Sequence, residues 1–512
     1  MGKYIKIYFW QAVSLLFNFA AIFVVTPFIS SNPSLYGIYS VVIAAYFFIS
    51  YADFGFLSAG MKYASESYAQ KNLTDEIEVI GFAGMIFLIF ACLYSIGVFF
   101  IAFNPTVIFN GISSPEELLV AKQLLILLAL TCPILVIQRV IQIIHSVRMM
   151  DYKFQRVLVL SNTLKLLSVF LFFGGGKYFI VEYFLFSQVC VLLAVITGLI
   201  MINSSLNYDL RALFRAFRLS NKLFSKTKKL AFTSIFLTVS WILYYELDPF
   251  AIARLFGSNS VAIYAIGFSI ITYFRSIFGI LFTPFIARFN HFIGLKDTEG
   301  LQLFFIKVMI LFLPITLFPV LSVFLTVDNF ILTWVGSAYT ESISIAKTLV
   351  LCYVFSFITY PAGILIMANE KVKALYYTSA LQPVIFWTGI IFTYKYLGLE
   401  SFAYFKFIAF FLESIVYIFL VLKFLQIDFF ELLRKVIIPI VIPTILVIVI
   451  VLMLHSYLPI TKGKLNMLYY FINIWFAVLC GFFAYYYTSK VFKENVDNII
   501  TSLLQKRLLK TN

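Results

Sequence analysis

The chain has 512 residues, of which 62% are hydrophobic and only 12% are charged. A soluble domain has about 25% charged residues, so this composition excludes an ordinary soluble protein and favours one that is solvated by lipid. The net charge of +15 would indicate nucleic-acid binding in a soluble protein, but in a membrane protein Lys and Arg first mark the cytoplasmic loops.

Apolar segments that are long enough to cross a bilayer recur from end to end. About 20 such residues span roughly 30 Å of hydrocarbon. The sequence predicts spanning helices at 8–29, 37–60, 79–103, 118–144, 155–173, 178–202, 230–253, 261–286, 301–326, 343–367, 375–395, 401–424, 436–456 and 467–488. The first segment is too long for a signal peptide and has no cleavage site after it, so we expect it to stay. We therefore predict an all-α polytopic membrane protein with about fourteen transmembrane helices.

The distribution of Lys and Arg predicts the orientation. Nearly all of the basic residues in connecting segments fall in one alternate set of loops, and the opposite set carries only Lys177, Arg254, Lys462 and Lys464. Because cytoplasmic loops are enriched in Lys and Arg, both termini are predicted to be cytoplasmic. The positive charge then reflects topology, and no nucleic-acid partner is expected.

The longest connecting segment, 203–229, is basic and contains Leu210, Leu213, Phe214 and Phe217. We expect it to be cytoplasmic and to lie on the membrane surface. It divides the chain into a six-helix N-terminal lobe (1–202), the connector itself (203–229), a six-helix C-terminal lobe (230–424), and two extra helices with a cytoplasmic tail (425–512). Similar residues at the starts of predicted helices two (35–40) and eight (261–266) indicate internal duplication.

Several charged residues lie inside predicted spans, where a charge costs at least about 2.5–3.5 kcal/mol at the bilayer centre. They are Asp53, Lys122, Arg139, Lys165, Glu246, Asp248, Arg275, Lys307, Lys347, Lys406 and Glu413. Lys165 and Arg275 are the deepest, and we expect both to line a cavity. The candidate lining residues of this cavity are Arg275, Lys165, Lys307, Lys347, Asp53, Asp248 and Glu413.

Each of these residues also has a purely structural interpretation. Lys122, Arg139, Lys307, Lys347 and Lys406 lie near predicted helix ends and could extend to the headgroups. Asp53 could be a hydrogen-bond acceptor between helices, and Glu246 and Asp248 could pair with Arg254. Lys165 and Arg275 could form buried ion pairs, for which Glu413 is the best acid.

Basic residues dominate the deepest positions, and a cationic cavity suits an anionic cargo, because Arg matches phosphate oxygens in a bidentate way. No catalytic, metal-binding or cofactor-binding site is predicted. The five cysteines lie inside apolar runs without paired spacing, the three histidines are far apart, and the sequence has no nucleotide-binding loop.

The first two predicted helices contain Pro27-Phe28-Ile29, Tyr36-Gly37-Ile38-Tyr39 and Asp53-Phe54-Gly55-Phe56, followed by the polar segment 62–69. Together with Asp248-Pro249-Phe250 and Val261-Ala262-Ile263-Tyr264, this combination resembles the polysaccharide flippases of the multidrug/oligosaccharidyl-lipid/polysaccharide exporter superfamily, especially O-antigen flippases of the Wzx type. The resemblance covers the whole chain in length, helix count and orientation.

The resemblance implies a protein of the bacterial inner membrane that is not an enzyme. Two six-helix lobes would enclose a cavity and alternate between inward-open and outward-open forms. The cargo would be an oligosaccharide linked to undecaprenyl pyrophosphate, and the partners would be membrane lipid, an O-antigen polymerase and a chain-length regulator. Arg275 fits an arginine that the family often keeps in helix eight. Predicted helix one offers only Gln11 and Asn18 where related flippases carry basic residues.

Two other functions remain open. A drug or metabolite exporter of the same superfamily would more often have an acidic cavity. A membrane O-antigen polymerase or glycosyltransferase would usually need a sizeable outer loop, whereas the outer segments here, 104–117 and 327–342, are short.

Overall fold

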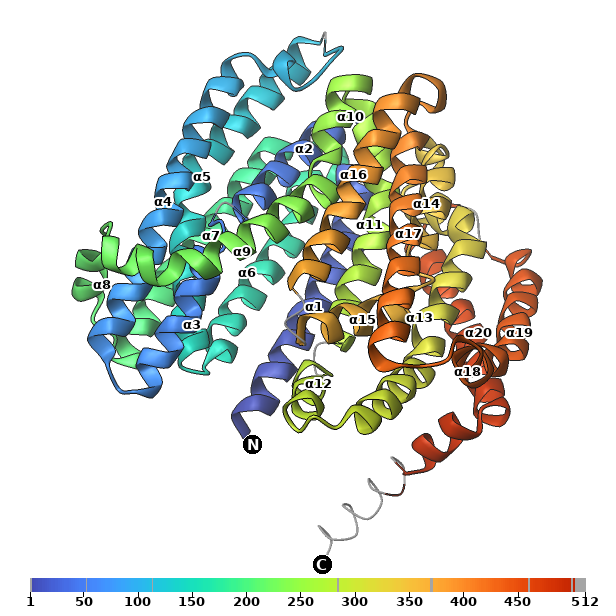
Figure 1. Ribbon diagram of the computed structural model, residues 1–512. Coiled ribbons are helices and arrows are strands. Elements are labelled where there is room, and N and C mark those ends of the chain that lie inside the picture. Colours follow the sequence, from blue (N-terminus) through green and yellow to red (C-terminus); the bar gives the residue numbers. More distant parts are fainter. Residues whose placement is uncertain are drawn as a thin grey trace, which may run out of the picture. The chain divides into compact units, whose positions relative to one another are not determined.

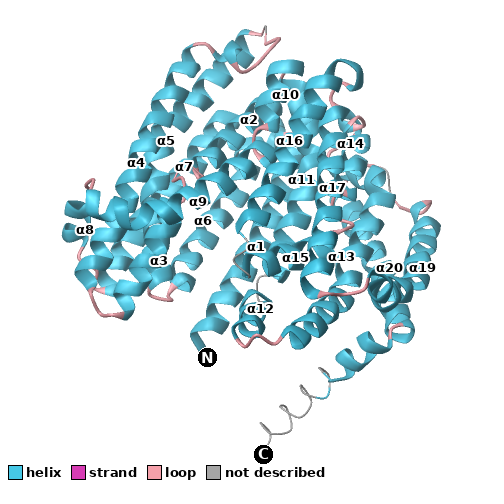
Figure 2. Ribbon diagram, in the orientation of Figure 1, coloured by secondary structure: helices cyan, strands magenta, loops and turns pink. Residues whose placement is uncertain are grey.

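The computed structural model describes residues 2–51, 53–112, 114–282, 285–368, 372–458, 461–498 and 501. All of the regular secondary structure in these residues is helical (Figure 2). Contacts along the chain group it into two compact units, a first unit of Met1–Ala265 and a second unit of Ile266–Asn512. The boundary falls inside a helix rather than in the basic connector, and the finer division into lobes and extra helices stays a prediction.

The first unit is a bundle of long apolar helices with three short ones (Figure 1). Its helices are α1 (Gly2–Ile29), α2 (Pro33–Ile49), α3 (Phe56–Ala69), α4 (Leu73–Phe103), α5 (Pro115–Val147), α6 (Asp151–Phe173), α7 (Ile180–Leu206), α8 (Leu210–Ala216), α9 (Asn221–Tyr245), α10 (Asp248–Phe256) and the start of α11 (Ser258–Phe282). Within the bundle, α4 packs against α3 and α5, α6 packs against α1 and α7, and α8 packs against α4.

Local sequence signals set the starts of several of these helices. Asn32 precedes Pro33, and its side-chain oxygen accepts a hydrogen bond of 3.2 Å from the backbone N–H of Leu35. Asn72 caps α4 in the same way, accepting from the N–H of Asp75 at 3.1 Å. A side-chain acceptor at this position satisfies an N–H group that has no partner within the helix. Asn32 and Asn72 therefore favour the start of a new helix directly after them.

The predicted helix 37–60 is broken in two. The backbone of Phe54 and Gly55 has positive φ angles of 45° and 75°. These two residues lie directly before α3, and their non-helical backbone keeps α3 separate from α2. Asp53 then accepts a hydrogen bond of 3.1 Å from the N–H of Leu57 in the first turn of α3. Gly55 is required here because a Cβ would lie 2.3 Å from the Ser234 Cβ of α9.

The two segments with similar sequences lie side by side where they begin. Gly37 of α2 packs so closely against Ser258, the first residue of α11, that a Cβ at position 37 would lie 1.7 Å from the Ser258 carbonyl oxygen. The hydroxyl groups of Ser34 and Ser258 are also hydrogen-bonded at 2.9 Å. Of the residues that suggested a duplication, Gly37 takes part in this contact, and its neighbour Ser258 lies just before the second matching segment.

The second unit is built around α13, which is the longest helix described (Thr298–Trp334). The other helices are the rest of α11, α12 (Phe285–Gly294), α14 (Ser342–Leu351), α15 (Ser356–Ala368), α16 (Val372–Leu397), α17 (Glu400–Leu425), α18 (Phe429–Leu432), the π-helical turn η4 (Leu433–Ile437), α19 (Ile438–His455) and α20 (Lys464–Thr488). The pair α19 and α20 packs on α13, and α17 packs against α14, α15 and α16.

Length and apolarity identify ten candidate membrane spans among the described residues, or eleven if the bent pair α14 and α15 is one span. Every predicted span coincides with one helix or with a pair of consecutive helices. The three predicted spans beyond the eleven correspond to α1, α2 and α16. The structure therefore confirms an all-α polytopic membrane protein, with ten or eleven candidate spans by length and composition among the described residues.

Candidate functional site

Lys165 lies near the middle of α6, eight residues from its C-terminal end, and is half-buried. The Ser168 hydroxyl donates to the Lys165 carbonyl at 2.8 Å, which is a contact within the helix. Among the described residues, no carboxylate lies within ion-pair distance of the Lys165 ammonium group. A cation held in a membrane span in this way needs water or an anionic ligand as its counter-charge.

Arg275 lies in α11 within the second unit and is partly buried. Aromatic rings surround this part of the helix: Phe274 and Phe278 lie 6.1 Å and 5.9 Å from the Tyr353 ring, and Phe282 stacks on Tyr360 at 5.5 Å. The Tyr360 hydroxyl also donates to the Arg275 carbonyl oxygen at 3.3 Å. The arginine therefore projects from a helix segment that is fixed by rigid packing.

Glu413 of α17 is buried, with 7% of its surface exposed. Its carboxylate accepts a hydrogen bond of 2.7 Å from the Gln382 amide of α16, and it also interacts with the Tyr417 hydroxyl. The sequence analysis considered an ion pair between Glu413 and Arg275. Among the described residues, the contacts of Glu413 do not include this ion pair. This acid belongs to a polar network between α16 and α17.

Lys406 is a residue whose importance the sequence analysis underestimated. Extension to the headgroups was one possible reading of Lys406, but its side chain is 1% exposed and lies between the Phe268 ring at 5.2 Å and the Phe386 ring at 4.5 Å. Its spacing from Glu413 is the signal that could have identified it, because residues seven apart fall on the same helix face. The buried face of α17 therefore carries a cation and an acid two turns apart.

The acidic candidates of the first unit have structural contacts. Asp53 caps α3 and lies outside a helix, as described above. Asp248, at the start of α10, is fully buried and accepts a hydrogen bond of 2.5 Å from the Tyr264 hydroxyl. Pairing with Arg254 was one possible structural role, but no ion pair of Arg254 is present among the described residues, and its guanidinium donates to the Thr106 carbonyl oxygen at 3.2 Å.

The remaining two candidates are less enclosed. Lys307 is exposed on α13, which agrees with a side chain that reaches the headgroups, and Lys347 is half-buried on α14. Lys165 lies in the first unit, and Arg275, Lys307, Lys347 and Glu413 lie in the second. Among the described residues, no group of three His, Cys, Asp or Glu side chains has the arrangement of a metal site.

Among known proteins, only solved structures match this chain. The sequence matches no family model and no curated protein. The lipid II flippase MurJ, in an inward closed conformation, matches with a TM-score of 0.70 at 14% identity, over 96% of this chain and 99% of that one.

Two further solved structures match less of the chain. An inward-facing multidrug resistance MATE transporter of the MOP superfamily matches with a TM-score of 0.64 at 13% identity, over 81% of this chain and 94% of that one. A MOP superfamily transporter from Pyrococcus furiosus, described as having a binding pocket of reverse polarity, matches with a TM-score of 0.56 at 14% identity, over 82% of this chain and 94% of that one. The chain therefore has the fold of MurJ and of the MATE transporters.

Proposed function

We propose that this protein is a flippase that moves a lipid-linked oligosaccharide, carried on undecaprenyl pyrophosphate, from the cytoplasmic to the outer leaflet of the bacterial inner membrane. It would work by alternating access through a cationic cavity, as a transporter and not as an enzyme. Both termini would be cytoplasmic, as the distribution of Lys and Arg predicts.

The observation that carries this proposal is the extent of the structural match. The fold of a lipid II flippase accounts for 96% of the chain, whereas the MATE transporter accounts for 81%. Likeness of fold does not fix the cargo, so the cargo must be argued from the charged groups.

The deep cations support an anionic cargo. Lys165 has no carboxylate at ion-pair distance among the described residues, and Glu413 of the second unit accepts from the Gln382 amide. A pyrophosphate would supply a counter-charge for Lys165, and an arginine such as Arg275 binds phosphate oxygens in a bidentate way. We assign Lys165 and Arg275 to the cargo path. Lys347, Lys307, Asp53, Asp248 and Glu413 stay predicted lining residues, with structural contacts now known for the three acids.

The MATE-like fold keeps an exporter of small molecules as the second candidate. Such exporters more often handle cations, and a cavity lined by Lys and Arg would repel them.

The test is deletion of the gene in the organism that carries it. We expect loss of surface glycan while lipid-linked repeat units accumulate inside, and restoration by the wild-type gene. Arg275→Ala, expressed to the same level, should restore little glycan, and Arg275→Lys should restore more because the charge remains. If single repeat units reach the outer surface and stay unpolymerised, the protein is a polymerase and the proposal is wrong.

A further inference from the structure

One arginine of the first unit is exposed on the side of its helix that points away from the lipid. Arg139 lies in α5, eight residues before the helix ends at Val147, and it is exposed. Leu130 is 65% exposed in the middle of the same helix and lies nine residues earlier, which is two and a half turns. The side chains of Leu130 and Arg139 therefore project from opposite sides of α5.

The side of α5 that carries Arg139 is otherwise buried. Leu135, Val136 and Ile143 lie one turn before or after Arg139 on the same side, and each is at most 9% exposed. A side chain that extends to the headgroups is expected on the lipid-facing side of a helix instead. An exposed guanidinium among buried neighbours indicates a water-accessible space on the inner side of α5, because an unsolvated charge in a span is costly.

Two polar groups of a neighbouring segment lie near Arg139. Its guanidinium interacts electrostatically with the hydroxyl of Tyr46, which is half-buried in α2, and with the carboxylate of Asp53. It also donates to the Gln142 side chain at 3.3 Å. Among the described residues, no carboxylate lies at ion-pair distance from Arg139, and the Tyr46 hydroxyl has no hydrogen-bond partner. Both groups therefore keep hydrogen-bonding capacity for a ligand.

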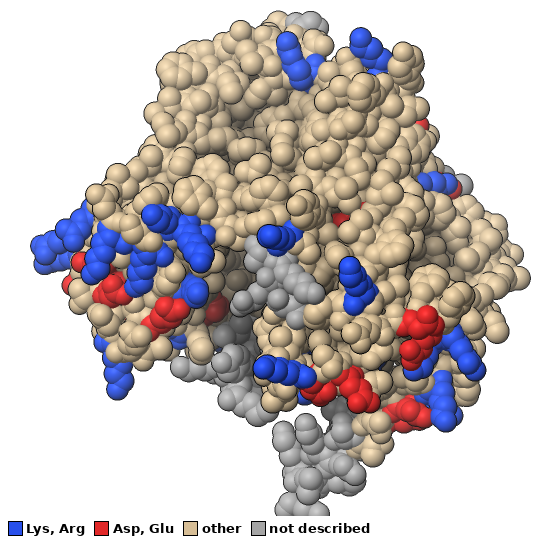
Figure 3. Space-filling view, viewed as in Figure 1, with Lys and Arg blue, Asp and Glu red and all other residues tan. Residues whose placement is uncertain are grey.

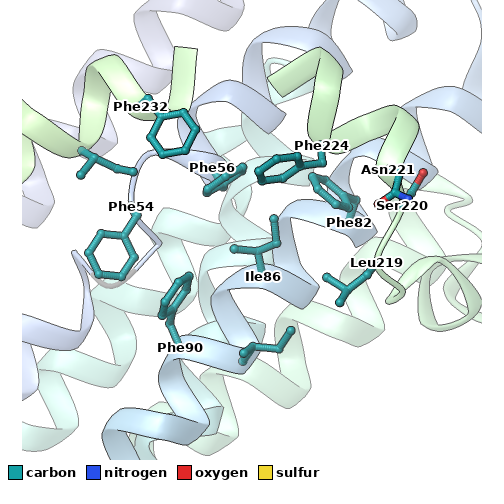
Figure 4. Close-up of a pocket in the computed structure, with 12 residues that line it drawn as sticks. Phe54, Phe56, Phe82, Ile86, Phe90, Leu219, Ser220, Asn221, Phe224 and Phe232 are labelled. Atoms are coloured by element: carbon teal, nitrogen blue, oxygen red, sulfur yellow. The ribbon is translucent and has the colours of Figure 1, made fainter. Parts of the chain in front are cut away.

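Asp53 does not neutralise Arg139, because its carboxylate is held in the break between α2 and α3. It accepts from an N–H of the first turn of α3. The rings that follow it are packed on other helices: Phe54 lies 4.6 Å from Phe90 of α4, and Phe56 stacks on Phe224 of α9 at 5.9 Å (Figure 4). This packing fixes the carboxylate near Arg139 without an ion pair.

Arg139 and Lys165 lie at different depths. The helices α5 and α6 meet at the turn 148–150. Along the helix axes, Arg139 is about 12 Å from this turn and Lys165 about 21 Å. Arg148 in the turn lies 4.7 Å from the Tyr208 ring, just before α8, and Figure 3 shows Lys and Arg side chains gathered over α8 and the start of α9. An anion that enters from this basic end reaches the depth of Arg139 before that of Lys165.

We propose that Arg139 and Tyr46 form a phosphate-binding position at the cytoplasmic entrance of the cargo path, which holds the pyrophosphate of the cargo before it reaches Lys165. This inference rests on the proposed function for its cargo and for its direction. A guanidinium and a phenol hydroxyl both donate to phosphate oxygens. Arginine binds two oxygens at once, so this position would orient the pyrophosphate, whereas Lys165 acts as a point charge.

The first experiment measures the binding of undecaprenyl pyrophosphate to the full chain in detergent and, separately, of undecaprenol, which lacks the phosphates. We expect Arg139→Gln to weaken binding of the pyrophosphate about tenfold and Tyr46→Phe about threefold, with undecaprenol unchanged. Arg139→Lys should lose less, because the charge remains. Lys122→Gln is the control, since it removes an exposed cation near the opposite end of α5. Melting temperatures show whether each variant is folded.

The outcomes separate this inference from the proposed function. If the wild-type protein binds undecaprenyl pyrophosphate no better than undecaprenol, the proposed cargo is wrong and this position falls with it. If Lys165→Gln weakens binding of the pyrophosphate and Arg139→Gln does not, only the position at Arg139 is wrong.

A second experiment tests the water-accessible space without any cargo. In a background without the five native cysteines, Arg139→Cys and Leu130→Cys are treated with a charged thiosulfonate in opened membranes. We expect Arg139→Cys to react and Leu130→Cys to stay unmodified, because lipid covers that side of α5 and excludes a charged reagent. An unreactive Arg139→Cys would overturn the proposal, whatever the cargo is.

Discussion

Charged side chains in the membrane spans are held by quite different surroundings. Lys406 lies between two phenylalanine rings, Asp248 accepts from a tyrosine hydroxyl, and Glu413 accepts from an amide. An aromatic face stabilises a desolvated ammonium group by up to about 2 kcal/mol, which offsets only part of the cost of burying it. A buried lysine kept under these conditions is a candidate for function.

Replacing Lys406 with Met separates function from stability. Met fills similar volume without the charge, and replacing buried charged groups by apolar ones of similar volume is often neutral or stabilising when no unpaired opposite charge is left behind. We expect an unchanged or higher melting temperature in detergent for Lys406→Met, together with reduced surface glycan in the complementation assay. A lower melting temperature with normal glycan would instead make Lys406 a structural residue.

Asp53 is also open to a test at this scale. Its carboxylate caps α3, and loss of such a cap costs about 1 kcal/mol. Asp53→Ala should therefore lower the melting temperature, and Asp53→Asn should not, because an asparagine oxygen accepts the same hydrogen bond. If Asp53→Asn is stable but does not support transport, the charge of Asp53 acts in the cargo path as the sequence suggested.

At the scale of helices, two predicted spans are interrupted, and one of the interruptions contains a glycine and a capping aspartate. The predicted span 37–60 becomes α2 and α3 because of Gly55 and Asp53, and the predicted span 343–367 becomes α14 and α15, which are bent by 52°. Hydropathy detects neither interruption, since most residues on both sides of each break are apolar. An apolar groove between α3, α4 and α9 depends on the first break. The position of Tyr360 in α15 depends on the second.

The close contact between α2 and α11 predicts that a larger residue at position 37 destabilises the protein. Gly37→Ala would place a methyl group into the Ser258 backbone, which is rigid, so we expect a clear fall in melting temperature. Gly97→Ala in α4 is the matched control, because a Cβ there meets nothing within 4 Å. In a helix, alanine is favoured over glycine by about 0.5–1 kcal/mol, so the control should be neutral or slightly stabilising. Equal effects of the two changes would contradict the close packing.

For the whole molecule, the proposed function depends on the predicted orientation in the membrane, in which both termini and the basic loops face the cytoplasm. Cysteines introduced at Lys229 and Lys462 should react from opposite sides of the membrane in a background without the five native cysteines. Lys229→Cys should react with an impermeant maleimide only after the membrane is opened, and Lys462→Cys should react in intact cells. The reverse pattern would place the basic loops and the termini on the outer side.

The sequence by itself determined that lipid surrounds the protein and that the fold is all-helical. Apolar runs of about 20 residues have few alternatives to spanning helices in lipid, where backbone groups must pair within the segment. The same reasoning placed each predicted span on one helix or on two consecutive helices, because it depends only on neighbouring residues.

Only the tertiary structure decided which charges are enclosed and by what. Lys406 and Lys307 look alike in sequence, but one is buried between rings and the other is exposed. Arg254 and Asp248 are six residues apart, yet they bond to a backbone carbonyl and to a tyrosine instead of to each other. These partners come from other helices, and the distances between helices depend on packing that no local pattern records.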